Sequence, residues 1–248
     1  MNFEIFRRLL LPLSAAFLPA DCLVCRGALP ARHEGGVCLP CWRSFSRLEG
    51  PCCRRCGDPV FVFERISPSP NHLCDDCRRR FRPFDRCRSA GIYDAALRTA
   101  IHRVKFDRER TLGRCLGRWL ARTLSSETAE VDRIVPVPLH PRRIRERGFN
   151  QSELLSEALA AASGIEHAPR LLTKTSPTRS QTTLGRQDRK KNLRGTFALT
   201  RGATAAKMRI LLVDDIYTTG CTVEECARVL RRAGARGVRV VTLARSVL

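Results

Sequence analysis

Four Cys-x-x-Cys pairs constrain this chain more than any other feature of its sequence. Two residues between cysteines let both thiolates face one tetrahedral ion from a tight turn, and two such pairs complete a four-cysteine zinc site. Spacers of 12 residues (26–37) and 17 residues (57–73) separate successive pairs. The sequence therefore predicts a double zinc ribbon over residues 21–80 with about two structural zinc ions. The pairs are Cys22/Cys25, Cys38/Cys41, Cys53/Cys56 and Cys74/Cys77.

The assignment of these cysteines to two sites stays open at this stage. Sequential grouping puts Cys22, Cys25, Cys38 and Cys41 in one site and Cys53, Cys56, Cys74 and Cys77 in the other. Interleaved grouping fits the spacing as well. A disulfide framework is the alternative to zinc, and the lack of a visible export signal disfavours it. Residues 20–80 have few periodic apolar positions, so metal binding is expected to supply their folding free energy.

Residues 1–20 are predicted to form a short amphipathic helix. The apolar run Leu9–Ala20 contains two prolines and is too short to span a bilayer. It follows two arginines, as a secretory signal would, but Asp21 precedes Cys22 and no A-x-A site follows the run. We therefore expect a cytoplasmic protein without a transmembrane segment, associated with membranes only through partners.

The net charge of +21 comes almost entirely from arginine, with 40 Arg against 5 Lys. Codon bias is one explanation of this excess. Guanidinium groups also match phosphate oxygens, so polyanions are plausible partners and single-stranded DNA is one candidate. Bases would need exposed aromatic side chains for stacking, for which Phe81, Phe84 and Trp42 are the candidates. Residues 81–90 are interpreted as a basic linker.

Residues 91–248 have the pattern of an α/β domain, although its first strand begins slightly earlier. Alternating strands and helices predict a mostly parallel sheet, which binds ligands beyond the carboxyl ends of its strands. Thr222 and Glu225 fit a capping box for the last helix. Residues 163–208 have an irregular pattern, and the sequence does not locate any small strands within them. The predicted strands are 89–93, 133–137, 209–213 and 238–243, and the predicted helices are 95–105, 112–124, 150–162 and 222–233.

The most informative run is the apolar strand 210–213 with the residues that follow it. Asp214 and Asp215 stand directly after the strand, and the turn 218–222, Thr-Thr-Gly-Cys-Thr, leads into a helix. Free backbone N–H groups, hydroxyls and a helix N-terminus suit a phosphate dianion. Paired carboxylates beside that phosphate suit a vicinal diol. The local chemistry therefore indicates a ribose 5-phosphate.

This run resembles the signature of the type I phosphoribosyltransferases, which bind 5-phosphoribosyl-1-pyrophosphate (PRPP). In that family the paired acids hold the ribose hydroxyls and the Thr/Gly loop holds the 5′-phosphate. The resemblance implies that Asp214 and Asp215 are the catalytic pair. It also implies that the 5′-phosphate is held by Thr218, Thr219, Gly220, Cys221 and Thr222, with Cys221 standing where many relatives carry Ser.

Further motifs resemble the ComF family of competence proteins and their GntX-like relatives, which are linked to DNA uptake and use. These motifs are Val135–Leu139, Arg142, Arg143, Arg145, Arg147–Gln151, His102–Phe106, and the run from Gln181 through Arg189, Asn192 and Phe197. A double zinc ribbon ahead of a transferase-like domain is similar to the same family. The resemblance implies a pyrophosphate loop in which Val137, Leu139 and His140 supply N–H groups, because prolines 136 and 138 cannot. Arg142, Arg143 and Arg147 would then face the pyrophosphate and its Mg²⁺.

The expected fold class is thus α/β, a type I phosphoribosyltransferase-like parallel sheet preceded by a small Cys-rich double zinc ribbon. Three functions remain open. One is a Mg–PRPP-binding phosphoribosyltransferase acting in DNA uptake or processing, by displacement at ribose C1 with loss of pyrophosphate. Another is a non-catalytic adaptor, regulated by PRPP, that recruits DNA or competence proteins. The third is a nucleobase salvage enzyme. Lys105, Tyr93 and Gln181 are the candidate acceptor residues.

Overall fold

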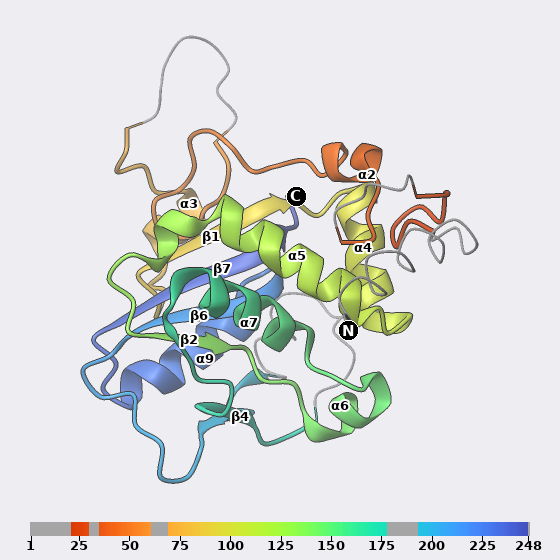
Figure 1. Cartoon of the computed structure of the whole chain (residues 1–248). Coiled ribbons are helices and arrows are strands. Elements are labelled where there is room, and N and C mark those ends of the chain that lie inside the picture. The colour runs from red at the N-terminus through yellow and green to blue at the C-terminus, as the bar shows by residue number, and fades with distance from the viewer. Residues whose placement is uncertain (1–20, 30–34, 61–68, 178–192, 248) are drawn as a thin grey trace, which may run out of the picture.

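The computed structural model describes residues 21–29, 35–60, 69–177 and 193–247 (Figure 1). The N-terminal helix predicted for residues 1–20 and the acceptor candidate Gln181 lie outside the described residues.

A five-stranded parallel sheet forms the centre of the protein (Figure 1). Its order is β1-β7-β6-β2-β3, and every neighbouring pair runs parallel. The strands are β1 (Arg86–Ile92), β2 (Arg133–Pro136), β3 (Glu166–His167), β6 (Arg209–Tyr217) and β7 (Gly237–Arg245). The middle strands β6 and β7 are almost wholly buried, because both of their faces are covered.

Two different layers cover the sheet. The apolar side chains of α4 (Ala95–Phe106), α5 (Arg110–Thr123) and α7 (Gln151–Ser163) share one core with sheet residues such as Leu211 and Val213. On the other face, α9 (Cys221–Arg232) and the antiparallel pair β4 (Leu172–Lys174) and β5 (Phe197–Leu199) pack against Ile210 and Leu212. The alternation of buried residues along β6 thus divides the interior into two cores. The short helices η1 (Ser125–Thr128) and α6 (Pro141–Arg147) complete this part of the chain.

The predicted strands and helices all occur, with shifted ends. The last helix differs most in its start, because Gly220 is its N-cap at φ 79° and Cys221 its first residue. The predicted capping box is therefore wrong. Glu225 instead accepts a hydrogen bond from the Gly195 N–H at 3.0 Å and pairs with Arg228.

The Cys-rich region packs into both cores. Its helices are α2 (Leu39–Arg43) and α3 (Asp75–Arg79). Cys22, Val37 and Phe45 join the core of α4, α5 and α7, whereas Cys53, Cys56 and Cys77 join the core of α9. Between them the chain runs along the edge of β1, where the Ile92 N–H donates to the Ser46 carbonyl at 2.8 Å.

The segment 81–90 is part of the folded body, so the prediction of a linker there needs correction. Phe84 is 1% exposed and lies in the α9 core. The Arg82 side chain is buried in an ion pair with Glu224, and β1 already begins at Arg86. The basic sequence resembles a solvated connector because Glu224, the buried acidic partner of Arg82, lies far along the chain.

Candidate functional site

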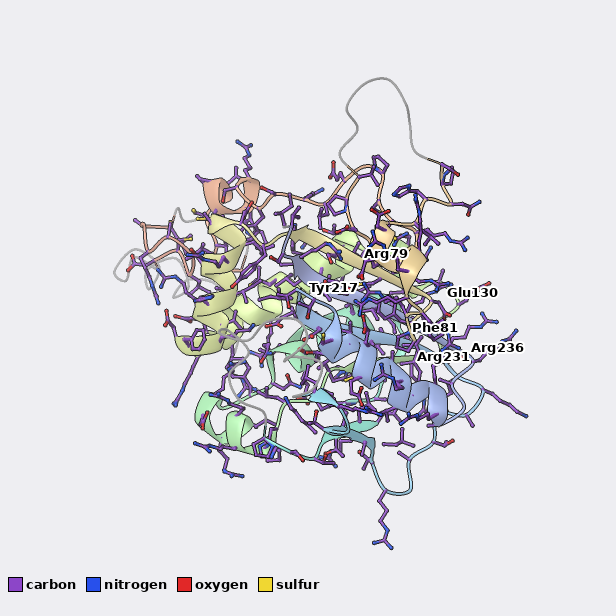
Figure 2. All side chains as sticks on the ribbon, turned by 180° about the vertical axis from the view of Figure 1, so that it is seen from behind. Arg79, Phe81, Glu130, Tyr217, Arg231 and Arg236 are labelled. Atoms are coloured by element: carbon purple, nitrogen blue, oxygen red, sulfur yellow. The ribbon has the colours of Figure 1, made fainter. Side chains whose placement is uncertain are left out.

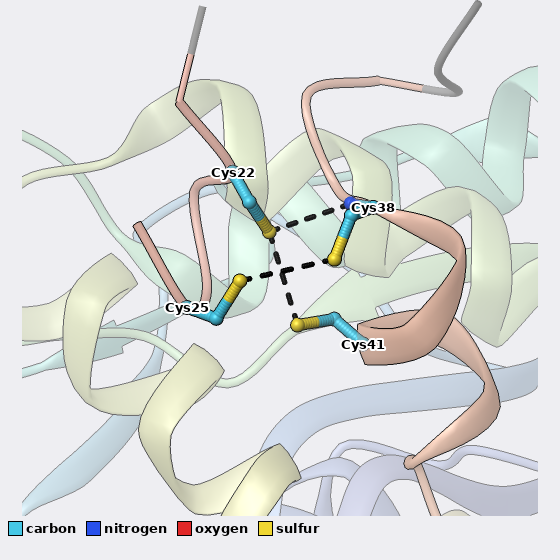
Figure 3. Close-up of side chains that lie close together, drawn as sticks. All are labelled: Cys22, Cys25, Cys38 and Cys41. Atoms are coloured by element: carbon cyan, nitrogen blue, oxygen red, sulfur yellow. Dashed lines mark hydrogen bonds between the residues drawn. The ribbon is translucent and has the colours of Figure 1, made fainter. Parts of the chain in front are cut away.

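The eight paired cysteines form two clusters, each grouped in sequential order. Cys22, Cys25, Cys38 and Cys41 surround one point, and Cys53, Cys56, Cys74 and Cys77 another, with all sulfurs of a cluster within 4.8 Å of one another. Figure 3 shows the first cluster, in which the Cys22–Cys41 and Cys25–Cys38 sulfur distances are both 3.8 Å. The Cys56–Cys74 distance is 3.6 Å.

These distances fit zinc and not disulfides. Four sulfurs at 2.3 Å from a tetrahedral Zn²⁺ lie about 3.8 Å apart, whereas a disulfide needs about 2.05 Å. Backbone N–H groups support the thiolates, since those of Val24 and Cys38 both donate to the Cys22 sulfur at 3.4 Å. The two first turns are also alike, because each ends on a residue of positive φ, Arg26 at 64° and Gly57 at 72°. The two sites therefore fit a double zinc ribbon in sequential grouping.

The paired acids lie within β6, beyond the point where β2 ends. Pro136 pairs with Val213, and β2 extends no further. The Ser152 hydroxyl on α7 donates to Asp214 Oδ1 at 3.0 Å, and the Asp215 N–H donates to the same oxygen at 2.9 Å. Burial raises the pKa of Asp214 to about 7, and the charge of Asp215 adds to this rise. Asp214 is thus a carboxyl group poised to exchange a proton near neutrality.

Asp215 faces a set of cationic and aromatic side chains. Lys105 of α4 forms an ion pair with its Oδ2. Burial lowers the pKa of Arg147, which the charge of Asp215 opposes, so this guanidinium lies near the same carboxylate. The Tyr93 hydroxyl is 3.1 Å from His102 Nε2. Within the motif 102–106, Lys105 therefore contacts the acid pair, and His102 connects the motif to Tyr93, the other acceptor candidate described by the structure.

The turn between β6 and α9 has the form of an anion-binding loop. Only glycine fits at position 220, because the backbone is left-handed there and a Cβ would lie 2.4 Å from the Tyr217 hydroxyl oxygen. The first intrahelical hydrogen bond runs from the Glu224 N–H to the Gly220 carbonyl at 2.9 Å. The N–H groups of residues 221–223 precede it and point out of the helix end. The Thr219 hydroxyl donates to the Cys221 sulfur at 3.2 Å.

The predicted pyrophosphate loop is brought to the site only in part. The Val137 N–H donates to the Val213 carbonyl at 2.8 Å, so it serves the sheet and is not available to a ligand. His140 caps α6, because its Nδ1 accepts the Arg142 N–H at 3.2 Å. Leu139 is half-buried in the loop before that helix.

The three predicted arginines of this region differ in position. Arg142 and Arg143 are exposed on α6, where both pair with Glu146 at 3.0 Å. Their cationic groups lower the pKa of Glu146. Arg147 is half-buried and hydrogen-bonds to Gln151. Of the three, Arg147 is thus the one placed toward the acids.

Sequence reasoning missed Ser152 and included Asn150 only as part of the motif 147–151, although both residues shape the site. Asn150 accepts the Ser152 N–H at 3.1 Å, which caps α7, and its Nδ2 donates to the Val137 carbonyl at 3.0 Å. Ser152 then holds Asp214. The signal was present, since Ser152 is a polar residue on the buried face of α7, which is otherwise mostly apolar.

Comparisons with known proteins agree with this architecture. Residues 13–78 match the double zinc ribbon domain. The chain is 34% identical to the DNA utilization protein YhgH of Salmonella typhimurium over 235 residues, covering 93% of this chain and 99% of that protein. It is 30% identical to competence protein F of Haemophilus influenzae over 236 residues, with the same coverage. The chain belongs to the ComF family. Its predicted fold class, a parallel α/β domain after a double zinc ribbon, is confirmed.

Solved structures similar to this ComF-family chain include two enzymes. One is the glutamine PRPP amidotransferase of B. subtilis, at 24% identity and a TM-score of 0.36, covering 52% of this chain and 25% of that one. The other is a hypoxanthine phosphoribosyltransferase of Staphylococcus aureus, at 13% identity and a TM-score of 0.36, covering 54% of this chain and 62% of that one. In the described part of the chain, no helix is long and apolar enough to cross a membrane.

Proposed function

We propose that this ComF-family protein binds Mg–PRPP in a phosphoribosyltransferase-type site and acts in the uptake or use of DNA. The observation that carries the first part is the position of Asp214 and Asp215 on a central strand, directly before a glycine-capped helix N-terminus. The kinship with a DNA utilization protein and a competence protein supports the second part.

Each element of the site has a role in this proposal. Asp214 and Asp215 accept hydrogen bonds from the ribose hydroxyls, and the N–H groups of residues 218–222 donate to the 5′-phosphate. Lys105 forms an ion pair with Asp215 and holds that carboxylate in place beside the ribose. Arg147 faces the pyrophosphate. In the reaction an acceptor forms a bond to ribose C1, and the bond from C1 to the pyrophosphate breaks.

Arg142 and Arg143 reach the pyrophosphate only by exchanging Glu146 for phosphate oxygens. Both guanidinium groups are exposed, so this exchange needs no rearrangement of the core. Leu139 remains the candidate for a backbone donor in this loop. Lys105 and Tyr93 remain the candidate acceptor-side residues, and the proposal leaves the acceptor itself undefined.

Calorimetric titration of Mg–PRPP tests the site. The wild type is expected to bind saturably, and the double variant Asp214→Asn/Asp215→Asn to bind at least about 100-fold more weakly. The reason is that hydrogen bonds to charged groups contribute about 1.5–3 kcal/mol each. The control is Glu49→Gln. It removes a carboxylate whose side chain is 75% exposed and which is far from the acids in the sequence. Absence of binding to folded, zinc-loaded wild type would refute the proposal.

A second candidate function is a nucleic-acid-binding adaptor, and the exposure of Phe81 favours it. Phe81 is 82% exposed, whereas Phe84 is in the core and Trp42 packs on Phe45 at 5.4 Å. Figure 2 shows Phe81 on the same side of the protein as Arg231 and Arg236. Arg231 is fixed there, since its Nε donates to the Pro83 carbonyl at 3.2 Å. An exposed ring among arginines suits a stacked base and its phosphate.

Fluorescence anisotropy with a labelled oligothymidylate tests this surface. Phe81→Ala is expected to weaken binding about tenfold, because stacking on an aromatic side chain contributes about 1–3 kcal/mol per base. Leu39→Ala, at another exposed apolar side chain, should leave the affinity unchanged. The affinity should also fall steeply with salt concentration. DNA binding by a protein that does not bind PRPP would favour an adaptor that PRPP does not regulate. A DNA affinity independent of salt concentration would exclude contacts to the phosphates.

A further inference from the structure

Two buried arginines connect the second zinc site to the residues on either side of the phosphate loop, Tyr217 before it and Glu224 after it. We propose that this site, formed by Cys53, Cys56, Cys74 and Cys77, positions the loop 218–222 for its phosphate through two arginines, Arg245 and Arg82. The loop's affinity for a ribose phosphate then depends on zinc in the second site and not on zinc in the first. This inference rests on the proposed function for its ligand, but its structural part can be tested without one.

The first connection is Arg245, the last residue of β7. Its guanidinium donates to the Cys56 carbonyl at 2.8 Å and to Asp58 Oδ1 at 2.7 Å, and lies 3.9 Å from the Cys56 sulfur. The same guanidinium stacks on the Tyr217 ring at 4.5 Å from its centroid. Arg245 is 5% exposed and Tyr217 is 2% exposed, so the contact is shielded from water.

Tyr217 passes this contact on to the loop. Its hydroxyl oxygen lies so close to Gly220 that a Cβ there would come within 2.4 Å. The ring therefore fills the space beneath the N-cap of α9, and the phosphate-facing N–H groups begin at that cap. A shift of the Tyr217 ring would shift those groups with it.

The second connection is Arg82, which reaches the far side of the loop. It forms ion pairs with Asp76, which lies between the ligands Cys74 and Cys77, and with Glu224 in the first turn of α9. Arg80 repeats the arrangement, with distances of 2.9 Å to Asp76 and 3.3 Å to Glu224. Both Arg82 and Glu224 are buried. The turn carrying the second pair of ligands is thus tied to the helix that follows the loop.

The first zinc site has a different attachment. Arg103 of α4 donates to the Val24 carbonyl at 2.8 Å, and the Cys115 thiol of α5 donates to the Gly35 carbonyl at 2.8 Å. Both contacts end in the helices of the other core. The two sites have the same ligands but different neighbours, so each is a control for the other.

Hydrogen exchange of the backbone amides of residues 216–224, measured on ligand-free protein, tests the structural part. Arg245→Lys and Arg82→Lys keep the charge but lose the guanidinium fork. We expect both variants to retain two zinc ions, to exchange these amides at least tenfold faster, and to bind D-ribose 5-phosphate about tenfold more weakly. Arg103→Lys removes the matching contact at the first site. It should leave both the exchange rates of these amides and the affinity for D-ribose 5-phosphate unchanged. Wild-type exchange rates in both Arg245→Lys and Arg82→Lys would overturn the proposal.

A pair of ligand substitutions provides the second test, should either arginine variant fail to fold. Cys74→Ser removes zinc from the second site and Cys25→Ser from the first. The proposal expects faster exchange over residues 216–224 in Cys74→Ser alone, and equal exchange in the two variants would contradict it. Failure of the wild type to bind D-ribose 5-phosphate would count against the proposed function, while the exchange rates would still decide the role of the second zinc site.

Discussion

Cys53→Ser is expected to leave one zinc ion per chain and to unfold the second ribbon. The binding free energy of a structural zinc site is on the order of 10 kcal/mol, and it acts as folding free energy for the segment that supplies the ligands. Cys53 is fully buried and its neighbours in the α9 core include Cys56 and Cys77. Loss of its thiolate therefore removes both a metal ligand and the order of the segment around it.

The adjacent cysteine offers a matched control. Cys52 differs from Cys53 by one position, is half-buried, and belongs to neither four-sulfur cluster among the described residues. Elemental analysis of reduced protein should find about two zinc ions per chain in the wild type and in Cys52→Ser, and about one in Cys53→Ser. Thermal unfolding should show a large loss of stability for Cys53→Ser alone. Equal zinc content in the two variants would contradict the assignment of ligands.

The features that the sequence predicts well are those encoded by residues close together in the chain. The spacing within each Cys-x-x-Cys pair is local, so the zinc ligands could be identified, although their grouping needed the structure. The run from Ile210 to Thr222 is also local, so its strand and the following turn into a helix could be predicted, although β6 continues to Tyr217 and contains the acids that were expected to follow it. Four-residue spacing of leucines likewise located α5.

The features that the sequence could not predict depend on pairs of residues that are far apart in the chain. Arg82 looked like part of a basic linker because Glu224, the buried one of its two acidic partners, is 142 residues away. The Val137 N–H was predicted to face a ligand. Its actual partner, the Val213 carbonyl, lies on β6, and the pairing of β2 with β6 is known only from the structure. Residue types alone do not indicate which hydrogen bonds a fold has already used.

The stability of the ligand-free protein is expected to fall as the pH rises toward 7. Burial and the charge of Asp215 raise the pKa of Asp214 to about 7 in the folded protein, whereas in an unfolded chain it is about 3.9. Between these values the folded state retains a proton that the unfolded state has lost, so stability decreases with increasing pH and levels off above the folded pKa. Each pKa unit corresponds to about 1.4 kcal/mol, which gives about 4 kcal/mol over the whole window.

Urea unfolding between pH 5.5 and 8 measures the upper part of this window, where zinc thiolates are not yet protonated. The wild type should lose about 2 kcal/mol between pH 5.5 and 7. Asp214→Asn should lack that slope, because its side chain does not titrate. Ser152→Ala removes a hydroxyl that favours the ionised carboxylate and should move the slope to higher pH. If PRPP binding requires the ionised form, its affinity should rise about tenfold between pH 6 and 8. Identical pH profiles for wild type and Asp214→Asn would show that Asp214 stays ionised throughout, and that Lys105 and Ser152 outweigh its burial.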